Sequence, residues 1–431
     1  MSKLLELIIS KKVKNYLLSS NCQLGFKEKH STSMCTFLMQ QTVNYYLSGR
    51  SDVFVVFLDA SKAFDRVKHS VLFEDLISRK ICPLYIRLIY VMYQLNNAII
   101  NWNGNKSKPF EMYNGLKQGG ILSPLLFAIY LDPLLKKIND SKVGCYMGDL
   151  PCNALAFADD VAILAPTISG INKLIGICED YGIRYSVKFN PSKSKIILFS
   201  NRNLNRNTDI YFNNIKIDQV NEHKYLGFDI NNSRSFYNIE KIINDMKVRA
   251  NAIKTNFSCL DSQSKIELCN SQCLSLYGAC LWNTDTTFIQ KLEIAWRVSC
   301  RAILSVHPRT HNYLIPQLMG TPDIKSIVQE RFLNFIIAGL KHENNFISFV
   351  FKNALNLTNS TIRLNINSII GKYSIPYMKL FYGRAMKVCK IDVKDEWKVT
   401  LIRELLYIRD YNVDILTYDE TKILVNYLCT F

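Results

Sequence analysis

Long apolar runs are missing from this sequence. No stretch of the roughly 18 residues that a membrane-spanning helix needs is both apolar throughout and free of charge. The opening residues, MSKLLELIISKK, hold an apolar run that is too short for a signal peptide. We therefore expect no contact with a membrane and a location inside the cell.

A disulfide framework is also missing, because the 13 cysteines are odd in number and scattered along the chain. Free thiols in a reducing compartment are the simplest account. Cys269 and Cys273, with His307 and His311, have zinc-like pair spacings, but positions 274–306 separate the pairs, far more than the usual about 12–15 residues. Both cysteines also fall on apolar positions of a predicted helix, which favours a place in the core.

Runs of five or more basic residues are absent, although Lys and Arg outnumber Asp and Glu by 53 to 36 and give a net charge of +17. A positive charge spread over the folded surface favours a polyanionic partner, nucleic acid before an anionic membrane. Hydrophobic residues make up 48% of the chain, which excludes general disorder. Aromatic residues at 12% suit base stacking, although most will belong to the core.

The pattern of predicted elements changes near residue 235. Before it, helical spacing at 3–20 and after Ser31, a predicted helix cap, alternates with short strand-like runs. After it, helical patterns dominate: Ile239–Phe257, Lys265–Trp282 and Phe288–Leu304. The first of these helices carries four basic residues: Lys241, Lys247, Arg249 and Lys254. They form either an ordinary solvated face or a surface that contacts the backbone of a nucleic acid.

The stretch Asn153–Pro166, NALAFADDVAILAP, joins two short apolar runs through the adjacent aspartates Asp159 and Asp160. Each run has the length of a buried strand, which predicts a tight hairpin. A solvated turn is the alternative, because turns often hold Asp. Two ionised carboxylates at the tip of a buried hairpin, however, repel each other and lose hydration unless a cation offsets this cost. Carboxylate oxygens are ligands that suit Mg²⁺.

A third carboxylate, Asp59, follows the unbroken β-branched and aromatic run Val53–Leu58. This run predicts a central strand buried on both faces. Ser61–Lys80 then has helical spacing, so Asp59 is predicted to lie between a strand end and a helix, where α/β folds often place functional groups. The alternative is an ordinary helix cap.

Two further patterns combine glycine or proline with short apolar runs. In GLKQGGILSPLLFAIYL, residues 115–131, glycines precede Ser123, a predicted N-cap, and Pro124, the predicted first helical residue. Such a helix start can bind phosphate, or the glycines can form a plain loop. Strand pairs are predicted around Asn190–Pro191 and around Gly227.

Five motifs occur in order: FLDASKAFD, GLKQGGILSPLLF, FADD, FNPSKS and YLG. Together they resemble the reverse transcriptases of non-long-terminal-repeat (LINE-type) retrotransposons, especially the Jockey and CR1-like branch. One motif alone would be a loose match, so the specificity lies in their order and separation. The resemblance covers residues 3–235 well and the remainder weakly.

This resemblance implies an α+β fold, a right-hand polymerase with palm and fingers and a mostly helical thumb and C-terminal region. We assign 1–235 to partial fingers and palm, 236–310 to a thumb-like region and 311–431 to a helical C-terminal region. Family members carry a further fingers segment and an endonuclease that would precede Met1, so we expect an N-terminally truncated copy. They also usually have Gly-Cys where this chain has Gly119–Gly120.

The resemblance also implies residue roles, motif by motif. The expected catalytic residues are Asp59, Asp159, Asp160 and Lys193; the nucleotide or template contacts are Phe64, Gln118 and Gly119; the primer grip is Tyr225, Leu226 and Gly227. The three aspartates are the expected metal ligands, with Asp159 binding directly and Asp160 supporting. Phe64 takes the place of the bulky aromatic that excludes a ribose 2′-hydroxyl.

The implied reaction is transfer of a nucleotide from a dNTP to a DNA primer 3′-hydroxyl on an RNA template. Two Mg²⁺ ions about 4 Å apart, or Mn²⁺ in their place, stabilise the attacking and departing oxygens in such reactions. An active protein of this kind would be expected in the nucleus. A truncated remnant that only binds nucleic acid is the alternative, and Phe64 argues against a third option, an RNA-templated RNA polymerase.

Overall fold

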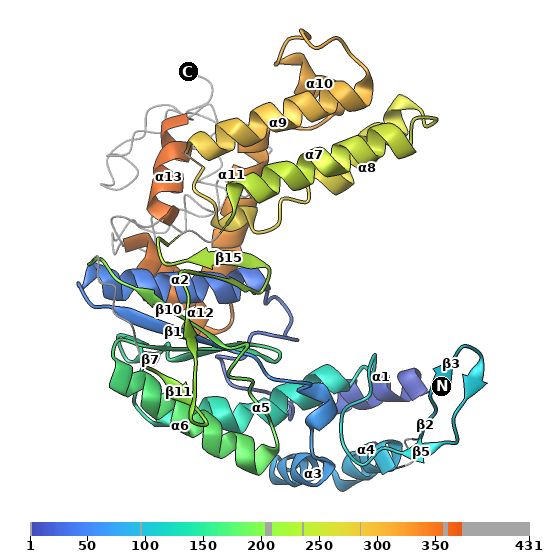
Figure 1. Cartoon of the computed structure of the whole chain (residues 1–431), viewed down its shortest axis with the longest axis vertical. Helices are drawn as coiled ribbons and strands as arrows, with labels where there is room; N and C mark the ends of the chain where they lie inside the picture. Colours follow the sequence, from blue (N-terminus) through green and yellow to red (C-terminus); the bar gives the residue numbers. More distant parts are fainter. Residues whose placement is uncertain are drawn as a thin grey trace, which may run out of the picture. The chain divides into compact units, whose positions relative to one another are not determined.

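The computed structural model describes residues 2–94, 97–202, 209–234, 237–284, 286–356 and 361–372 (Figure 1). Its chain forms two compact units, 1–234 and 235–431. Each unit has a hydrophobic core of its own. Part of the predicted C-terminal region, residues 373–431, lies outside the described residues.

The described part of the N-terminal unit combines helices with short strands. Its helices are α1 (Ser2–Val13), α2 (Thr32–Ser48), η1 (Phe64–Arg66), α3 (His69–Ser78), α4 (Pro83–Gln94), α5 (Ser123–Asp140) and α6 (Ile168–Tyr185). Its strands are β1 (Val53–Leu58), β2 (Asn97–Ala98), β3 (Asn101–Trp102), β4 (Asn105–Lys106), β5 (Phe110–Glu111), β6 (Tyr146–Met147), β7 (Leu150–Pro151), β8 (Ala154–Phe157), β9 (Asp160–Ala165), β10 (Lys195–Phe199), β11 (Tyr211–Phe212), β12 (Ile215–Lys216), β13 (Asp218–Gln219), β14 (Glu222–Tyr225) and β15 (Phe228–Asn231).

One five-stranded sheet organises this unit, in the order β13-β10-β1-β9-β8. β1 lies at its centre, and all six of its residues are buried, as the unbroken apolar run predicted. β1 pairs antiparallel with β9 and β10, and β9 pairs antiparallel with β8. The hairpin predicted from the FADD stretch is therefore confirmed, and it pairs directly with β1, the strand that precedes Asp59.

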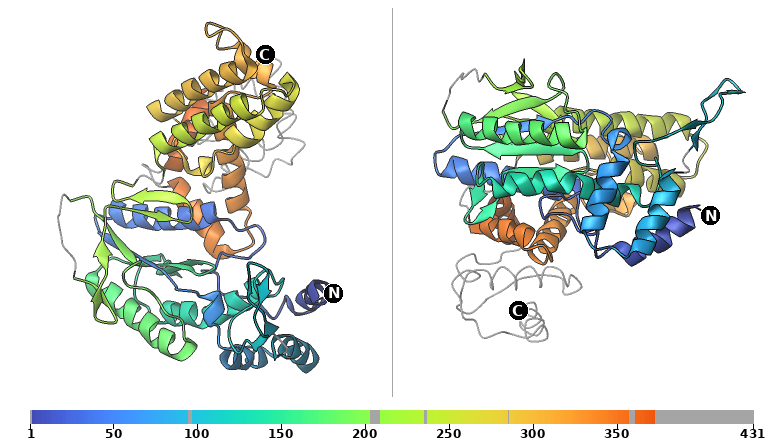
Figure 2. Two further views of the ribbon diagram at one scale, coloured as in Figure 1. Left: turned by 45° about the vertical axis from the view of Figure 1, so that its right-hand side comes forward. Right: turned by 90° about the horizontal axis from the view of Figure 1, so that it is seen from below.

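Helices cover both faces of this sheet. α2 packs on β1 and β8 from one side, while α5 and α6 lie next to each other on the other side (Figure 1, Figure 2). The predicted cap of α2 is confirmed, because the Ser31 side chain accepts a hydrogen bond from Met34 N at 3.2 Å. α6 is amphipathic, and it buries Ile171, Leu174 and Cys178 on one face.

The prediction of one helix over Ser61–Lys80 is wrong. The segment forms the short 3₁₀ helix η1, then an extended residue, Val67, and then α3. The physical reason is a competing set of backbone hydrogen bonds, since Leu116 N donates to Phe64 O at 2.9 Å and Gly115 N donates to Val67 O at 2.8 Å. Similarly, of the two strands predicted around Asn190–Pro191, only β10 forms.

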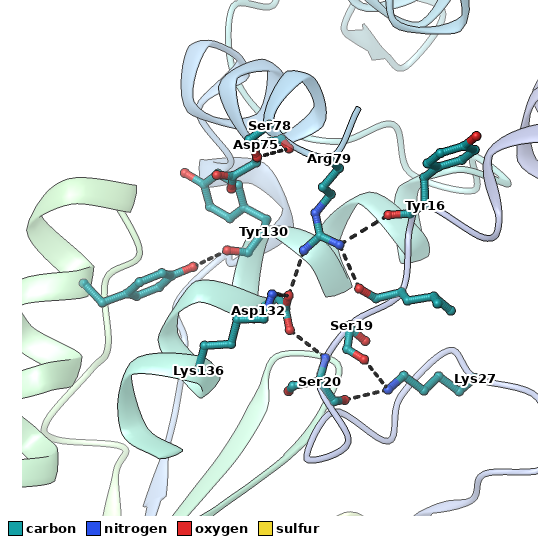
Figure 3. A network of polar contacts seen from close by, with 12 residues as sticks. Tyr16, Ser19, Ser20, Lys27, Asp75, Ser78, Arg79, Tyr130, Asp132 and Lys136 are labelled. Carbon is teal, nitrogen blue, oxygen red and sulfur yellow. Dashed lines mark hydrogen bonds and ion pairs between the residues drawn. The ribbon is translucent and has the colours of Figure 1, made fainter. Parts of the chain in front are cut away.

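A buried carboxylate of α5 connects the loop after α1 to Arg79, which directly follows α3 (Figure 3). Asp132 of α5 is fully buried and forms ion pairs with Arg79 at 2.7 Å and with Lys136 at 2.8 Å. It also accepts a hydrogen bond from Ser20 N at 2.6 Å, while Arg79 donates to Leu18 O at 2.7 Å. These contacts fix the path of the chain just before residues 22–25, which run beside β8.

The described part of the second unit is helical. It contains α7 (Ile239–Asn256), α8 (Ser262–Cys273), η2 (Ala279–Leu281), α9 (Thr287–Leu304), α10 (Leu314–Met319), α11 (Ile324–Leu340), α12 (Asn345–Asn356) and α13 (Thr361–Lys372). α7, α8 and α9 pack on one another around a core that holds Trp282 and Trp296. The helix predicted over Lys265–Trp282 is too long, because the chain leaves α8 after Cys273 and turns at Gly278, where φ is +76°.

Two cysteines that resembled part of a zinc site lie in the core, as predicted. Cys269 and Cys273 are buried in the core of the second unit, whereas His307 and His311 are exposed.

Arg249, one of the basic residues on α7, donates a hydrogen bond to Gln272 O at 2.7 Å and therefore connects α7 to α8. Within the described residues, no helix is long and apolar enough to cross a membrane.

Candidate active site

The hairpin between β8 and β9 carries two of the predicted catalytic residues at its tip. Phe157 and Asp160 form the last pair of the ladder, so Ala158 and Asp159 are the two turn residues. Ala158 has φ +59°, a left-handed conformation that disfavours a residue with a Cβ. Asp159 is half-buried, and Asp160, although its residue surface is largely exposed, is partly desolvated by its neighbours.

The register of the sheet brings Asp59 to the same place. Leu58 of β1 pairs with Val161 of β9. Asp59 and Asp160 each lie one residue beyond this pair, so they leave the sheet at the same edge, with neighbouring strands about 4.8 Å apart. The structure therefore brings together the strand end and the hairpin tip that the sequence predicted to converge.

The electrostatics of this edge reflect carboxylates that have lost part of their hydration and lie near other negative charges. Loss of hydration, then repulsion from Asp159 and Asp59, raises the pKa of Asp160 to about 6. Loss of hydration, together with the charge of Asp59, also raises the pKa of Asp159 above its ordinary value. A carboxylate pair of this kind favours a bound cation or a shared proton.

The backbone of Asp59 is held by the loop that carries the predicted Lys193. Asn190 N donates to Asp59 O at 2.8 Å, and the Ser194 hydroxyl, which is 1% exposed, accepts from Asp59 N at 3.2 Å. Ser194 Oγ donates in turn to Asn190 O at 2.8 Å. Lys193 itself is exposed on this loop.

Phe64, in η1 shortly after Asp59 in the chain, packs between two other aromatic rings. Its ring stacks on Phe127 of α5, with centroids 4.2 Å apart and planes at 16°, and meets the Phe26 ring edge-on at 6.2 Å. Sequence reasoning did not single out Phe26, whose neighbourhood is polar in the sequence. Packing against rings on two sides leaves the Phe64 side chain little freedom to move.

The loop before α5 differs from the prediction at its helix start. The N-cap is Leu122, without a side-chain cap, and Ser123 is already helical, with its hydroxyl donating to Lys117 O at 2.6 Å. The carboxylate of Glu6 in α1, 4% exposed, takes the capping role by accepting from Ile121 N at 2.5 Å. This end of α5 is therefore already neutralised, which argues against a phosphate there.

Gln118 and Gly119 lie at the exposed turn of this loop, and Gly119 has φ +72°. The loop is anchored to the segment that carries Phe64 through the hydrogen bond from Leu116 N. Gln118 is therefore accessible, and nothing lies within 4 Å of a Cβ built on Gly119, so this turn leaves room for a ligand.

The predicted primer-grip motif forms the hairpin β14–β15, with Leu226 at φ +49° and Gly227 at φ +84° in its turn. The pattern of a short strand pair bent at Gly227 is confirmed. Tyr225 is 4% exposed, and its hydroxyl donates to Asp160 O at 3.5 Å. Its ring also lies 4.9 Å from that of Phe57 in β1. Tyr225 thus braces the aspartate hairpin, and only Leu226 and Gly227 are open to a ligand.

Comparison with known proteins identifies the family. The profile of the family described as "Reverse transcriptase (RNA-dependent DNA polymerase)" matches residues 1–230, more than half of the chain. The chain belongs to the reverse transcriptase family. The right-hand polymerase fold and the family expected from the five motifs are thereby confirmed.

Its relatives come from mobile elements. A Pol polyprotein of the retrotransposable element R2DM from Drosophila melanogaster is 31% identical over 140 residues, which is 32% of this chain and 13% of that protein. A probable RNA-directed DNA polymerase from transposon X-element of the same species is 25% identical over 290 residues, 64% of this chain and 30% of that protein. The chain thus spans less than a third of the length of these relatives.

Among solved structures, a telomerase from Candida albicans in complex with a fragment of telomeric RNA is similar, with a TM-score of 0.43 and 10% identity. The similarity covers 88% of this chain and 55% of the telomerase chain.

Reverse transcriptases use divalent metal ions, so the donor set can be tested for fit. Asp59 and Asp160 supply hard carboxylate oxygens from adjacent strands, and Mg²⁺ is usually held by one or two carboxylates plus substrate phosphates. Within the described residues, no three His, Cys, Asp or Glu side chains are gathered closely enough to enclose an ion by themselves. The site therefore fits an ion that shares its ligands with a nucleotide, rather than a closed protein cage.

Little space surrounds Gly120, where the resemblance to the family led us to expect Cys. A Cβ there would lie 2.6 Å from Ser123 Oγ and 3.1 Å from Glu6 Oε2. We expect Gly120→Cys to lower the free energy of unfolding by about 1–3 kcal/mol, because the side chain must displace the Ser123 hydroxyl. Equilibrium urea unfolding measures this loss.

Two further variants make this expectation specific. Gly120→Cys combined with Ser123→Ala should recover most of the lost stability, because the hydroxyl in the way is gone. Gly176→Ala in α6, where nothing lies within 4 Å of an added Cβ, should be neutral or stabilising by about 0.5–1 kcal/mol. A Gly120→Cys protein as stable as the wild type would contradict the packing argument.

Proposed function

We propose that this chain is an RNA-directed DNA polymerase that transfers nucleotides from dNTPs to the 3′-hydroxyl of a DNA primer paired with an RNA template. The observation that supports this most is the convergence of Asp59 with Asp159 and Asp160 at one sheet edge of a reverse transcriptase domain. The net charge of +17 favours the nucleic-acid partners. A protein that copied RNA into chromosomal DNA would act in the nucleus.

In this proposal Asp59, Asp159 and Asp160 hold two divalent ions, with Asp159 as a direct ligand. Bound Mg²⁺ would stabilise the negative charge on the attacking and departing oxygens. Loss of hydration, followed by repulsion from Asp159 and Asp59, raises the pKa of Asp160 to about 6. This supplies a reason for binding, because a cation relieves the repulsion between the carboxylates.

The other residues position the substrates. Phe64, braced by Phe127 and Phe26, excludes a ribose 2′-hydroxyl, because its ring cannot move aside. Gln118 and Gly119 contact the incoming nucleotide and template from the exposed turn before α5. Lys193 approaches the leaving pyrophosphate, and the turn Leu226–Gly227 supports the primer end.

Primer extension tests the proposal. Purified protein should extend a DNA primer on an RNA template with dNTPs when Mg²⁺ or Mn²⁺ is added, should stop in EDTA, and should use rNTPs poorly. Binding of the primer–template without incorporation, across metals and templates, would instead identify a chain that only binds nucleic acid. A preference for rNTPs would contradict the role given to Phe64.

A further inference from the structure

A glutamine from the loop between α1 and α2 reaches the tip of the aspartate hairpin. The segment Cys22–Leu24 runs parallel to β8, since Leu24 N donates to Ala156 O at 2.8 Å and Ala156 N donates to Cys22 O at 2.9 Å. Gln23 lies between these two bonds, in a bridge with Ala156, and its side chain is fully buried.

The side-chain amide of Gln23 binds both polar backbone groups of Ala158. Ala158 N donates to Gln23 Oε1 at 3.1 Å, and Gln23 Nε2 donates to Ala158 O at 3.1 Å. Oε1 also accepts from Gly25 N at 2.9 Å, which orients the amide. One side chain therefore holds the peptide groups on both sides of the first turn residue.

These hydrogen bonds act where the hairpin is strained. Ala158 has φ +59°, which costs free energy for a residue with a Cβ. The carbonyl of Ala158 lies in the same planar peptide group as the N–H of Asp159. Fixing this carbonyl therefore restricts the direction in which the Asp159 side chain projects. A buried amide with matched partners is suited to this, because losing it would leave polar groups unpaired.

We call the hydrogen bonds between the Gln23 side chain and the backbone of Ala158 the clamp. The backbone around the clamp is packed too closely for the loop to take another path. A Cβ at Gly25 would lie 2.3 Å from Ala158 N and 3.0 Å from Phe157 C, both backbone atoms. The loop therefore approaches the turn as closely as a backbone can, and Asp132 anchors the preceding residue Ser20 through its backbone N–H.

We propose that Gln23 is a positioning residue of the active site, which sets the geometry of the Ala158–Asp159 turn and thereby the placement of the Asp159 carboxylate. It does not contact substrate. The inference rests on the proposed polymerase function for its kinetic consequence, but the clamp itself can be tested without activity.

The kinetic test compares two buried glutamines. Gln23→Met keeps the length of the side chain and removes all three hydrogen bonds. The control is Gln41→Met in α2, since Gln41 is also fully buried but its amide atoms have no hydrogen-bond partner among the residues that the structure describes. Steady-state primer extension is measured for both variants over a range of dNTP and Mg²⁺ concentrations.

We expect Gln23→Met to lower kcat about 100-fold, the effect of misplacing a reacting group by about 1 Å. The Mg²⁺ concentration for half-maximal rate should rise, while KM for dNTP changes little, because a displaced Asp159 weakens metal binding rather than nucleotide binding. Gln41→Met should stay within about twofold of the wild type. Equal kcat and equal Mg²⁺ dependence for Gln23→Met and the wild type would overturn the positioning role.

Amide hydrogen exchange separates this inference from the proposed function. In folded Gln23→Met, exchange of the Ala158 amide should be at least about tenfold faster than in the wild type and in Gln41→Met, because its acceptor is gone. Unchanged exchange would refute the clamp whether or not the wild type makes DNA. A wild type that makes no DNA, with faster exchange in the variant, would reject the polymerase and keep the clamp.

Discussion

Asp159→Asn is expected to lower the rate of DNA synthesis by on the order of 10³-fold or more. Groups that stabilise the charge of a transferring phosphoryl group contribute effects of about this size. The substitution keeps the shape of the side chain, so the β8–β9 turn can form, but an amide oxygen is a poor substitute for an anionic metal ligand. Single-turnover primer extension at saturating Mg²⁺ measures the loss.

The matched control is Asp149→Asn, which changes an exposed aspartate in the turn of another hairpin, β6–β7. It should leave the rate within about twofold of the wild type. Asp160→Asn should have a smaller effect than Asp159→Asn if Asp160 is the supporting ligand. If Asp159→Asn retained more than a tenth of the wild-type rate, the catalytic assignment would be wrong.

Stability should not explain the loss. Lost hydration, followed by the charge of nearby carboxylates, raises the pKa of both aspartates at the hairpin tip. A carboxyl whose pKa is higher in the folded than in the unfolded protein destabilises the fold at pH values above its ordinary pKa. The reason is that the unfolded chain gives up the proton more readily. Removing one charge at pH 7 should therefore leave the melting temperature unchanged or higher.

Asp132→Ala is expected to destabilise the N-terminal unit by about 3 kcal/mol. Removing one partner of a buried ion pair costs about 3–5 kcal/mol, because the other charge remains without compensation. The lower end applies here, since Arg79 is 17% exposed and Lys136 is 60% exposed, so water can hydrate both after the change. Urea unfolding followed by circular dichroism measures the shift.

Asp140→Ala provides the comparison for Asp132→Ala, because Asp140 is the exposed last residue of the same helix, α5. A negative charge at a helix C-terminus is slightly unfavourable, so this variant should lie within about 0.5 kcal/mol of the wild type. Similar stability for both variants would mean that the Asp132 network contributes nothing beyond a surface charge.

Features that depend on nearby residues could be predicted from the sequence. The all-apolar run Val53–Leu58 predicted a central strand, and the two apolar arms around Asp159 predicted a hairpin, because residue spacing along a strand is local. The helix predicted over Ser61–Lys80 failed, because backbone partners from residues 115 and 116 compete with the helical hydrogen bonds.

The supporting residues could not be predicted in this way. Gln23 is 135 positions from Ala158, and Glu6 is 115 positions from Ile121. A lone polar residue in a loop has no periodic signal, and its role depends on which backbone groups packing leaves unpaired. Ser194 belongs to the FNPSKS motif, but its hydrogen bond from Asp59 N, 135 positions away, could not be predicted for the same reason.

The sequence by itself determined the family, the three aspartates and the strand and hairpin that carry them, because these are encoded in short motifs and in the periodicity of apolar residues. Only the tertiary structure decided that β1 pairs with β9 in the register that aligns Asp59 with Asp160, and that Gln23 holds the turn before Asp159. The reason is that strand register and side-chain-to-backbone hydrogen bonds between distant segments arise from packing of the whole sheet, which no local pattern contains.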